Sequence, residues 1–414
     1  MEDSLNSRDA YAVLKIRDFK WFVFARFLFT FAIQMQSVIV GWQIYELTHD
    51  ALYLGLIGLA EAIPFILISL FAGGHMADIF SRKKIILIST SVYIICAIAL
   101  FLISSQFHHY LIIFGAYPIY IVIITTGLAR GFLTPAISAF SAQLVPKELY
   151  GNASTWNSMA WHTAAVTGPA IGGLIYGFFG IEISYLLVVC FSIFGLLCFS
   201  AIRSKPMPER SGKENIFRSL SVGFEFVFHN QIILSALSLD MFAVFFGGAV
   251  SILPVFADQI LHTGAKGLGF LRAAPAVGAI IMSLFQAHWP LFKQAGRNLL
   301  ICVFAFGLCM IVFALSTNFY VALLILMISG MVDNVSVVIR ATIVQLYTPN
   351  EMRGRVSAVN GIFIGSSNEL GSFESGVAAK LLGLIPSVIF GGTMTLGVVA
   401  AVRSLAPKLR KLSL

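Results

Sequence analysis

A chain of 414 residues that is 58% hydrophobic and only 11% charged is too apolar for a water-soluble domain of ordinary composition. Soluble domains carry about a quarter charged residues, so the bilayer is the expected solvent for most of this chain. The formal net charge of +8 also suits a nucleic-acid-binding protein, and the positions of the basic residues must decide between the two classes.

Twelve mostly apolar runs have about the length that a helix needs to cross a bilayer. The polar segment RSKPMPERSGKEN (203–215) divides the chain almost in half, and an amphipathic helix at the membrane interface is expected over 216–230. We therefore predict an all-α membrane protein with two pseudo-symmetric six-helix bundles (1–202, and 230–414 with its basic tail), joined by a cytoplasmic linker (203–229). The predicted spans are 19–45, 53–79, 83–104, 111–144, 152–179, 183–202, 230–258, 267–289, 298–316, 319–346, 355–380 and 386–405.

Basic residues concentrate in alternate loops. Most of the 27 lysines and arginines fall on the side that holds both termini, the linker and the cluster Arg82-Lys83-Lys84, whereas the opposite loops hold only Lys266 and Lys380. The excess of positive charge marks the cytoplasmic side. We expect a multi-pass protein of the bacterial inner membrane with both termini in the cytoplasm, and this arrangement explains most of the positive charge without nucleic acid.

The two halves of the chain are related by an internal repeat at a spacing of 203 residues. Two six-helix halves with a long linker are typical of secondary transporters, in which the substrate lies between the halves near the bilayer midplane. The matching residues are Gly127, Pro146, Glu148, Gly151, Ser154, Asn157, Gly168 and Gly173 in the first half, and Gly330, Pro349, Glu351, Gly354, Ser357, Asn360, Gly371 and Gly376 in the second.

Two motifs resemble signatures of the major facilitator superfamily. GGHMADIFSRKK, with Gly74, Asp78 and Arg82, resembles the signature of its loop between spans two and three. AVTGPAIGG (165–173) resembles the span-five signature of its antiporters, and segments 145–155 and 348–361 resemble the branch that contains the enterobactin exporter and drug–proton antiporters. The span-five positions that match are Gly168, Pro169, Gly172 and Gly173.

The resemblance implies roles for these residues. Asp78 would meet the start of span eleven near Arg355 while the outer side is open, Arg82 would hold that aspartate, and Gly74 would let helices approach closely. Simple topogenic charge explains Lys83 and Lys84. Pro169 removes a backbone donor and should bend span five. The resemblance implies a tightly packed bend through which ions cannot leak, as in the superfamily's exporters. The alternative is generic close packing of helices.

Nine ionisable residues fall within the predicted spans. Each costs a few kcal/mol if it faces hydrocarbon, so we expect them to line a central cavity or to pair. Asp333 and Arg340 are seven residues and about 10 Å apart on one helix face, so they can share a partner but cannot touch. The nine residues are Arg26, Glu61, Arg130, Asp240, Arg272, Asp333, Arg340, Glu369 and Glu374.

Proton coupling requires a carboxylate that loses and regains a proton during transport. Glu61, Asp240, Asp333, Glu369 and Glu374 are the candidates, and for each one a structural ion pair is the alternative. We expect Arg130 to line the cavity and to bias a nearby carboxylate. In span one, Trp42 and Gln43 are among the residues that could line an aromatic, polar pocket.

The sequence lacks the patterns of an enzyme or an ATP-driven pump. It has no HExxH or Cys/His spacing and no phosphate-binding glycine loop followed by Lys-Ser/Thr, and its five cysteines lie inside apolar runs. We expect no enzymatic activity, no cofactor and no metal. The expected partners are a small-molecule substrate, protons and the lipid bilayer, and we expect a monomer.

The main hypothesis is therefore a secondary transporter that uses the proton gradient to export a siderophore or an amphipathic drug-like compound by alternating access. One alternative is uptake of a siderophore, a metal complex or another solute. The other is a lipid flippase or scramblase on the same fold.

Overall fold

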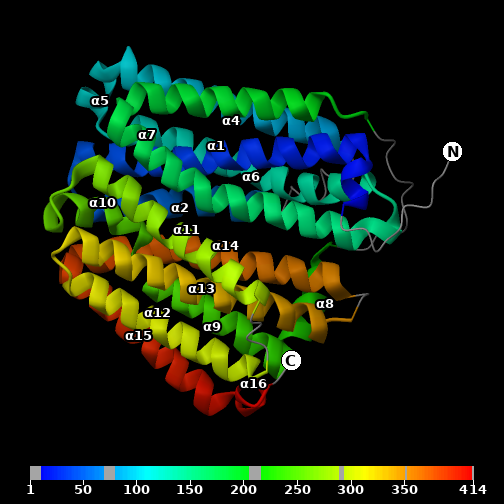
Figure 1. Cartoon of the computed structure of the whole chain (residues 1–414). Coiled ribbons are helices and arrows are strands. Elements are labelled where there is room, and N and C mark those ends of the chain that lie inside the picture. Colours follow the sequence, from blue (N-terminus) through cyan, green and yellow to red (C-terminus); the bar gives the residue numbers. More distant parts are fainter. Residues whose placement is uncertain (1–10, 70–79, 205–215, 289–292, 350–351, 413–414) are drawn as a thin grey trace. The chain divides into compact units, whose positions relative to one another are not determined.

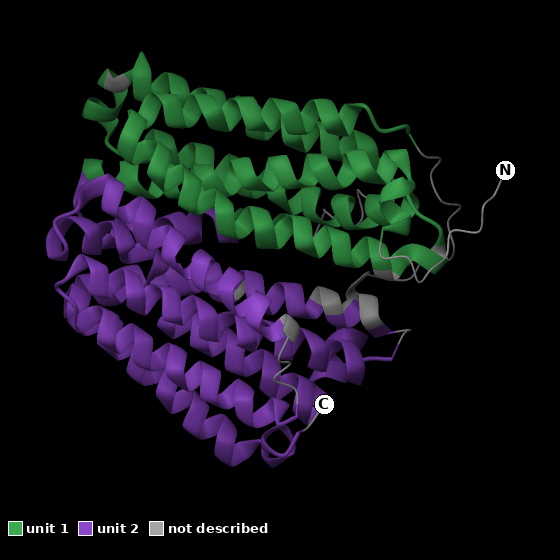
Figure 2. Ribbon diagram, in the orientation of Figure 1, with its two compact units in different colours: residues 1–47, 63–212 green, residues 48–62, 213–414 purple. Residues whose placement is uncertain are grey.

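The computed structural model describes residues 11–69, 80–204, 216–288, 293–349 and 352–412. These residues form two compact units (Figure 2). Unit 1 comprises residues 1–47 and 63–212, and unit 2 comprises residues 48–62 and 213–414. The boundary between the units therefore falls inside the second helix of the chain as well as in the polar linker.

Unit 1 is built from long helices whose apolar sequences favour no other structure in lipid. Within it α1, α4, α6 and α7 lie side by side (Figure 1). Its elements are η1 (Ala12–Lys15), α1 (Arg17–Thr48), the second part of α2 (Ala51–Ile68), α4 (Arg82–Ser105), α5 (His108–Phe114), α6 (Tyr117–Gln143), η3 (Lys147–Leu149) and α7 (Tyr150–Ser200).

Unit 2 contains the first part of α2 and the rest of the described chain. Within it α13 packs against both α11 and α12, and α9 packs against α14 and α15. Its further elements are α8 (Ile216–His229), α9 (Gln231–Gly247), η4 (Ala249–Ile252), α10 (Leu253–Val255), η5 (Phe256–Ile260), α11 (Gly264–His288), α12 (Ala295–Leu315), α13 (Phe319–Tyr347), α14 (Arg353–Leu382), α15 (Leu384–Leu405) and α16 (Pro407–Arg410).

All twelve predicted spans correspond to helices, and part of the second (70–79) lies outside the described residues. Ten helical segments of the described chain are apolar and long enough to cross a membrane. One of them, within α7, holds two predicted spans, because Gly180 turns the chain with a positive φ of 82°. α14 has 30 residues and is the eleventh span, but its many polar residues keep it outside that apolar set.

Two predicted spans are interrupted. The span predicted over 111–144 is divided into α5 and α6, because Gly115 adopts a positive φ of 58°. The span predicted over 230–258 breaks after α9 at Gly247-Gly248 and continues as η4, α10 and the π-helix η5. At this break the hydroxyl of Ser375 donates to the free carbonyl of Gly248 over 3.3 Å.

The predicted amphipathic helix is confirmed as α8, and its apolar side packs within unit 2. Val227 is fully buried in a cluster with Val356 and Val359 at the start of α14. A Cβ on Gly223 would lie 3.1 Å from the carbonyl oxygen of Arg355, so the two helix backbones approach closely. The linker helix therefore has a protein partner for its apolar residues, in addition to any contact with lipid.

Glycines let α7 pack against the middle of α1. A Cβ on Gly168 would lie 2.8 Å from Cβ of Gln34, and one on Gly172 would lie 2.7 Å from Cγ of Met35. Gly173 is buried beside them, and Pro169 is inside the helix. The span-five signature thus forms a seam, a close helix–helix contact. Small residues let the two backbones pack tightly, and this packing holds the helices together in lipid, where the hydrophobic effect does not.

A second seam joins the first part of α2 to α14 in unit 2. A Cβ on Gly376 would lie 2.7 Å from Cα of Gly55, and one on Gly58 would lie 3.0 Å from Cβ of Ser372. At the end of this seam Asp50 and Lys380 form an ion pair. The carboxylate of Asp50 also accepts from the N–H of Leu52 over 3.0 Å, which fixes the start of α2.

We predict that Gly172→Ala lowers the unfolding temperature of the detergent-purified protein. The new methyl group must displace Met35 in a closely packed seam, and overpacking of this kind costs about 1–3 kcal/mol. Gly41→Ala in α1 is the matched control, because its Cβ would meet nothing within 4 Å. An unchanged unfolding temperature for Gly172→Ala would contradict the close seam.

The ion pair of Asp50 makes a prediction about pH. Burial acts to raise the pKa of Asp50, but the hydrogen bonds from Lys380 and from the N–H of Leu52, with the charge of Lys380, together lower it below the ordinary 3.8. A carboxyl group with a lowered pKa in the folded state contributes stability above its unfolded pKa and loses it as the pH falls through its folded pKa.

We therefore expect Asp50→Asn to lower stability by a constant amount, below about 1 kcal/mol, between pH 7 and pH 5. The difference should shrink only below about pH 4. Thermal unfolding across this range measures it. The double variant with Lys380→Gln should match the single variants, and additive losses would show that the pair contributes nothing.

Candidate functional site

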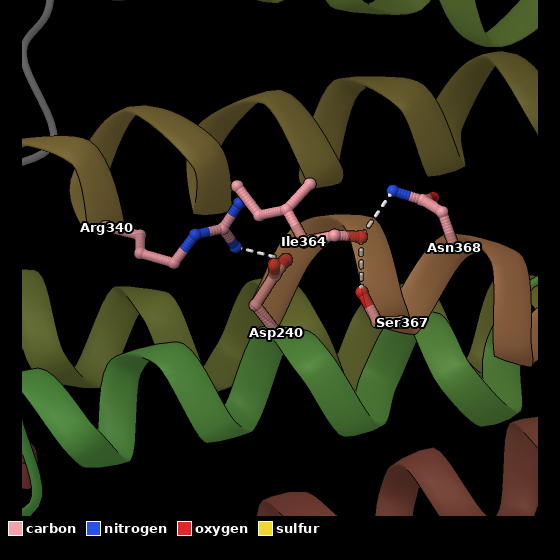
Figure 3. Close-up of polar contacts among 5 residues, drawn as sticks. All are labelled: Asp240, Arg340, Ile364, Ser367 and Asn368. Atoms are coloured by element: carbon pink, nitrogen blue, oxygen red, sulfur yellow. Dashed lines mark hydrogen bonds and ion pairs between the residues drawn. The ribbon is translucent and has the colours of Figure 1, made fainter. Parts of the chain in front are cut away.

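A buried ion pair joins two membrane-spanning helices of unit 2. Asp240 of α9 pairs with Arg340 of α13, and the two residues are only 9% and 7% exposed. Figure 3 shows the guanidinium of Arg340 directed at the carboxylate, with α14 beside the pair. The sequence allowed Arg340 and Asp333 to share a partner. Asp240 is the counter-charge of Arg340, whereas it repels Asp333, which is also a carboxylate.

A second carboxylate belongs to the same cluster. Asp333 lies seven residues before Arg340 on α13, is exposed, and interacts electrostatically with both Asp240 and Arg340. The exposed apolar residues Leu324 and Leu346 lie about half a turn around the helix from Asp333. Asp333 therefore points away from the apolar surface of α13, and the cluster holds two carboxylates for one arginine.

α14 presents polar atoms next to this cluster. The carbonyl oxygen of Ile364 accepts from the hydroxyl of Ser367 over 3.0 Å and from the side-chain amide of Asn368 over 2.9 Å (Figure 3). Ser367 is buried and Asn368 is exposed. Their side chains satisfy the helix backbone locally, which suits a helix that is too polar to face hydrocarbon.

Uncharged polar residues that the sequence analysis overlooked connect α11 to α13. Asn334, next to Asp333, accepts from the hydroxyl of Ser283 over 3.2 Å and from the amide of Gln286 over 3.1 Å. A single Ser, Gln or Asn in an apolar run does not indicate a functional site, because such residues are common in membrane helices, whereas an ionisable residue does. Arg272 lies on α11 as well and forms no ion pair with Asp240 or Asp333 in the described structure.

The other predicted carboxylates lie apart from this cluster. Glu61 is partly buried on α2, and Glu369 is partly buried on α14 at the seam with α2, where its carbonyl lies against Gly58. Glu374 is partly buried on the flank of α14 that carries Leu370 and Leu381, which are 37% and 77% exposed. The structure thus assembles Asp240, Asp333 and Arg340, and it does not bring Glu374 to them.

Unit 1 holds the two remaining predicted cavity residues. The guanidinium carbon of Arg130 on α6 lies 4.7 Å from the ring centre of Phe65 on α2, which is a cation–π contact. Arg26 is partly buried on α1. Arg130 and Arg26 thus lie on separate helices of unit 1, and the cation–π contact holds the Arg130 side chain against α2.

The polar residues of span one are structural. Gln43 is buried and accepts from the hydroxyl of Tyr185 over 2.6 Å. Glu46 accepts from Trp42 over 2.5 Å and from Tyr176 over 2.7 Å. Trp42 and Gln43 are therefore committed to contacts inside unit 1. Glu46 escaped the sequence analysis because it lies one residue beyond the predicted span.

Arg82, a residue of the predicted gate, and its neighbour Lys83 each bond to another helix of unit 1. Arg82 donates to the carbonyl of Ala139 in α6 over 3.1 Å. Lys83 donates to the carbonyl of Ser200 at the end of α7 over 2.8 Å, where a cation also favours the helix dipole. Lys83 thus has a structural role beyond the topogenic charge that the sequence suggested.

The remaining gate residues are only partly within the described structure. Gly74 and Asp78 lie outside the described residues. Arg355 is partly buried in the first turn of α14 and approaches the sulfur of Met352 at 3.8 Å. The gating role of these four residues, including Arg82, stays a prediction.

Comparison with known proteins gives one family along almost the whole chain. The model of a family described as transmembrane secretion effector matches residues 8–413. The chain is 27% identical over 341 residues to the enterobactin exporter EntS of Shigella dysenteriae serotype 1 (strain Sd197) and to that of Escherichia coli O1:K1 / APEC. Each match covers 81% of this chain and 79% of the relative.

Solved structures share the fold at low identity. A POT family transporter in complex with 5-aminolevulinic acid has a TM-score of 0.73 and 14% identity, covering 95% of this chain and 97% of that one. A bacterial homolog of the human lysosomal transporter Spinster has a TM-score of 0.71 and 15% identity, covering 96% and 98%. The predicted fold, that of the major facilitator superfamily, is confirmed.

We predict that Asp240→Asn destabilises the protein by about 3–5 kcal/mol, because Arg340 is left buried without its counter-charge. Replacing both residues, with Asp240→Leu and Arg340→Met, should recover most of the loss. Thermal unfolding in detergent measures both effects. Ser336→Ala, at a buried and uncharged position of α13, is the control. A full loss that persists in the double variant would contradict the pairing argument.

Proposed function

The chain belongs to the transmembrane secretion effector family of the major facilitator superfamily, and from this membership we propose that it is a proton-coupled exporter. It would exchange external protons for a siderophore or an amphipathic drug-like compound by alternating access. The proposed location is the bacterial inner membrane, with both termini in the cytoplasm, since the basic residues concentrate on that side.

The observation that carries the proposal is the cluster of two carboxylates and one arginine in unit 2. Arg340 neutralises Asp240, which leaves Asp333 as the surplus negative charge. A carboxylate without its own counter-charge is a suitable group to bind and release a proton during transport. Asp333 is exposed and can exchange that proton with water, whereas Asp240 is buried against Arg340.

A coupling step follows from this arrangement. Protonation of Asp333 removes one of the two negative charges near Arg340, which strengthens the ion pair between Arg340 and Asp240. Loss of the proton restores a negative charge that repels Asp240 and attracts Arg340 without direct contact. A substrate whose binding favours one of these states would then exchange with the proton, because two ligands that favour different states are linked thermodynamically.

The relatives guide the choice of substrate. The curated relatives are enterobactin exporters at 27% identity, so enterobactin is the first compound to test and smaller amphipathic compounds are the second. We also propose that Gly74, Asp78, Arg82 and Arg355 form the gate on the cytoplasmic side. The hydrogen bond from Arg82 to the carbonyl of Ala139 supports a fixed position of this guanidinium at the end of α6.

The test is transport in proteoliposomes that contain the purified protein and an imposed pH gradient. We expect enterobactin to move against the proton flux, and collapse of the gradient with a protonophore should stop accumulation. Asp333→Asn should lose the response to the gradient and keep binding of the compound. Asp18→Asn, in the first turn of α1, is the control.

Accumulation that is unchanged by the protonophore would overturn proton coupling. Substrate movement in the direction of the proton flux would instead establish uptake. Equilibration of labelled lipid without any gradient would establish a scramblase.

A further inference from the structure

We propose that Arg272 binds the acidic group of the transported compound, at one end of a polar stripe on unit 2. The polar stripe consists of Arg272, Ser283 and Gln286 of α11 together with Asn334 of α13. The inference rests on the proposed function and adds the substrate class: an amphipathic acid that also carries hydrogen-bonding groups. Such an acid is a carboxylate, a phosphate or an ionised phenol.

The stripe follows from helix geometry. Ser283 and Gln286 lie 11 and 14 residues after Arg272, about three and four turns of an α-helix, so the three residues share one side of α11. The strongly exposed apolar residues of α11 lie elsewhere. Ile280, Leu284 and Ile281, which are 52%, 64% and 44% exposed, fall about a quarter, a third and half of a turn away around the helix. The polar stripe therefore points away from the apolar surface of α11.

Arg272 has a positive charge that the described residues do not balance. Its Nε is buried and has no hydrogen-bond partner in the described structure. Arg340 on α13 has Asp240 as its counter-charge. An uncompensated guanidinium in a membrane-spanning helix is unfavourable by several kcal/mol. A bound anion removes this penalty, and the planar guanidinium can hold two oxygens of one acidic group.

The helices that carry the polar stripe are in backbone contact, so its groups are fixed in place. A Cβ on Gly330 of α13 would lie 2.5 Å from Cα of Pro275, and one on Gly278 of α11 would lie 3.1 Å from the nitrogen of Met331. Further along the stripe the carbonyl oxygen of the Asn334 side chain accepts from both Ser283 and Gln286. A site held this rigidly loses little entropy when a ligand binds.

The second helix of each half carries a charge before a proline, and the two charges are opposite. Glu61-Ala62-Ile63-Pro64 in α2 and Arg272-Ala273-Ala274-Pro275 in α11 belong to the second and eighth spans, although they are 211 residues apart and not the 203 of the internal repeat. Each charged residue stands three places before a proline inside its helix. Both helices thus have a charged residue three positions before a proline, but the sign of the charge is opposite. We infer that Arg272 is a feature of this half that sets the charge of the ligand.

The experiment compares two probes that differ in charge alone, coumarin-3-carboxylate and coumarin-3-carboxamide. Their binding to the purified full-length protein in detergent is followed by isothermal titration. We expect the carboxylate to bind about tenfold or more tightly than the amide, which is the range of one charged hydrogen-bonded contact. Arg272→Gln should reduce this ratio to about one by weakening carboxylate binding, with amide binding unchanged.

Two further variants keep the test decisive. Arg272→Lys retains the charge and loses the two-pronged geometry, so it should give an intermediate ratio and a protein that folds. Arg297→Gln makes the same change of charge at an exposed position at the start of α12, and its ratio should equal that of the unaltered protein.

Equal binding of both probes to the unaltered protein, no binding of either, or a ratio that survives Arg272→Gln would each overturn the proposal. The assay needs no proton gradient, so its outcome is independent of whether transport is proton-coupled. Loss of proton coupling with a normal binding ratio would refute only the proposed coupling. A flat binding ratio with intact coupling would refute only the role of Arg272.

Discussion

The free energy of a charge in the membrane interior is the constraint on which the function of this structure depends. Backbone groups of the described spans avoid the constraint through helical hydrogen bonds and, at the break after α9, through the hydroxyl of Ser375. Ionisable side chains avoid it only by pairing, by reaching water or by binding a ligand. Asp240 and Arg340 take the first solution, since both are almost fully buried and oppose each other across α9 and α13.

The charges that remain after this pairing have opposite signs and lie on different helices of unit 2. Asp333 on α13 is a negative charge without its own counter-charge, and Arg272 on α11 is a positive charge without one. An ion pair between them would remove both, yet Asp333 interacts with Asp240 and Arg340 and Arg272 has no partner among the described residues. Because Asp333 and Arg272 are not paired with each other, we propose different ligands for them: a proton for Asp333 and the acidic group of a substrate for Arg272.

The sequence predicted the helices well because each span has to be apolar and of fixed length, which hydropathy measures directly. The interruptions at Gly115 and at Gly247-Gly248 were not predicted, since a glycine in an apolar run is compatible with a helix and with a break. The sequence also showed that Asp333 and Arg340 cannot touch on one helix and that Arg340 needs a counter-charge from elsewhere. It could not choose Asp240, because that residue lies on another helix and only packing decides which sides of two helices meet.

The same reasoning explains why part of the site was missed. Ser283, Gln286 and Asn334 have no charge, so their presence in a span is not unfavourable enough to mark them, although together they join two helices. Conversely, Glu374 stood out by its charge, and the structure places it on a flank with exposed leucines. Charge marks the residues that need an explanation, and packing decides which of them act together.

Close backbone contact is what makes the arrangement of charges effective. In lipid, helices gain little from burying apolar side chains, so they associate where glycine lets them approach, as between α7 and α1 and between α11 and α13. Where glycines bring two backbones into contact, no side chain can change its rotamer to let the helices move. With α11 and α13 fixed in this way, Arg272 and Asp333 cannot move together to neutralise each other. This fixed imbalance is the physical basis of the two proposals, a proton at Asp333 and the acidic group of a substrate at Arg272.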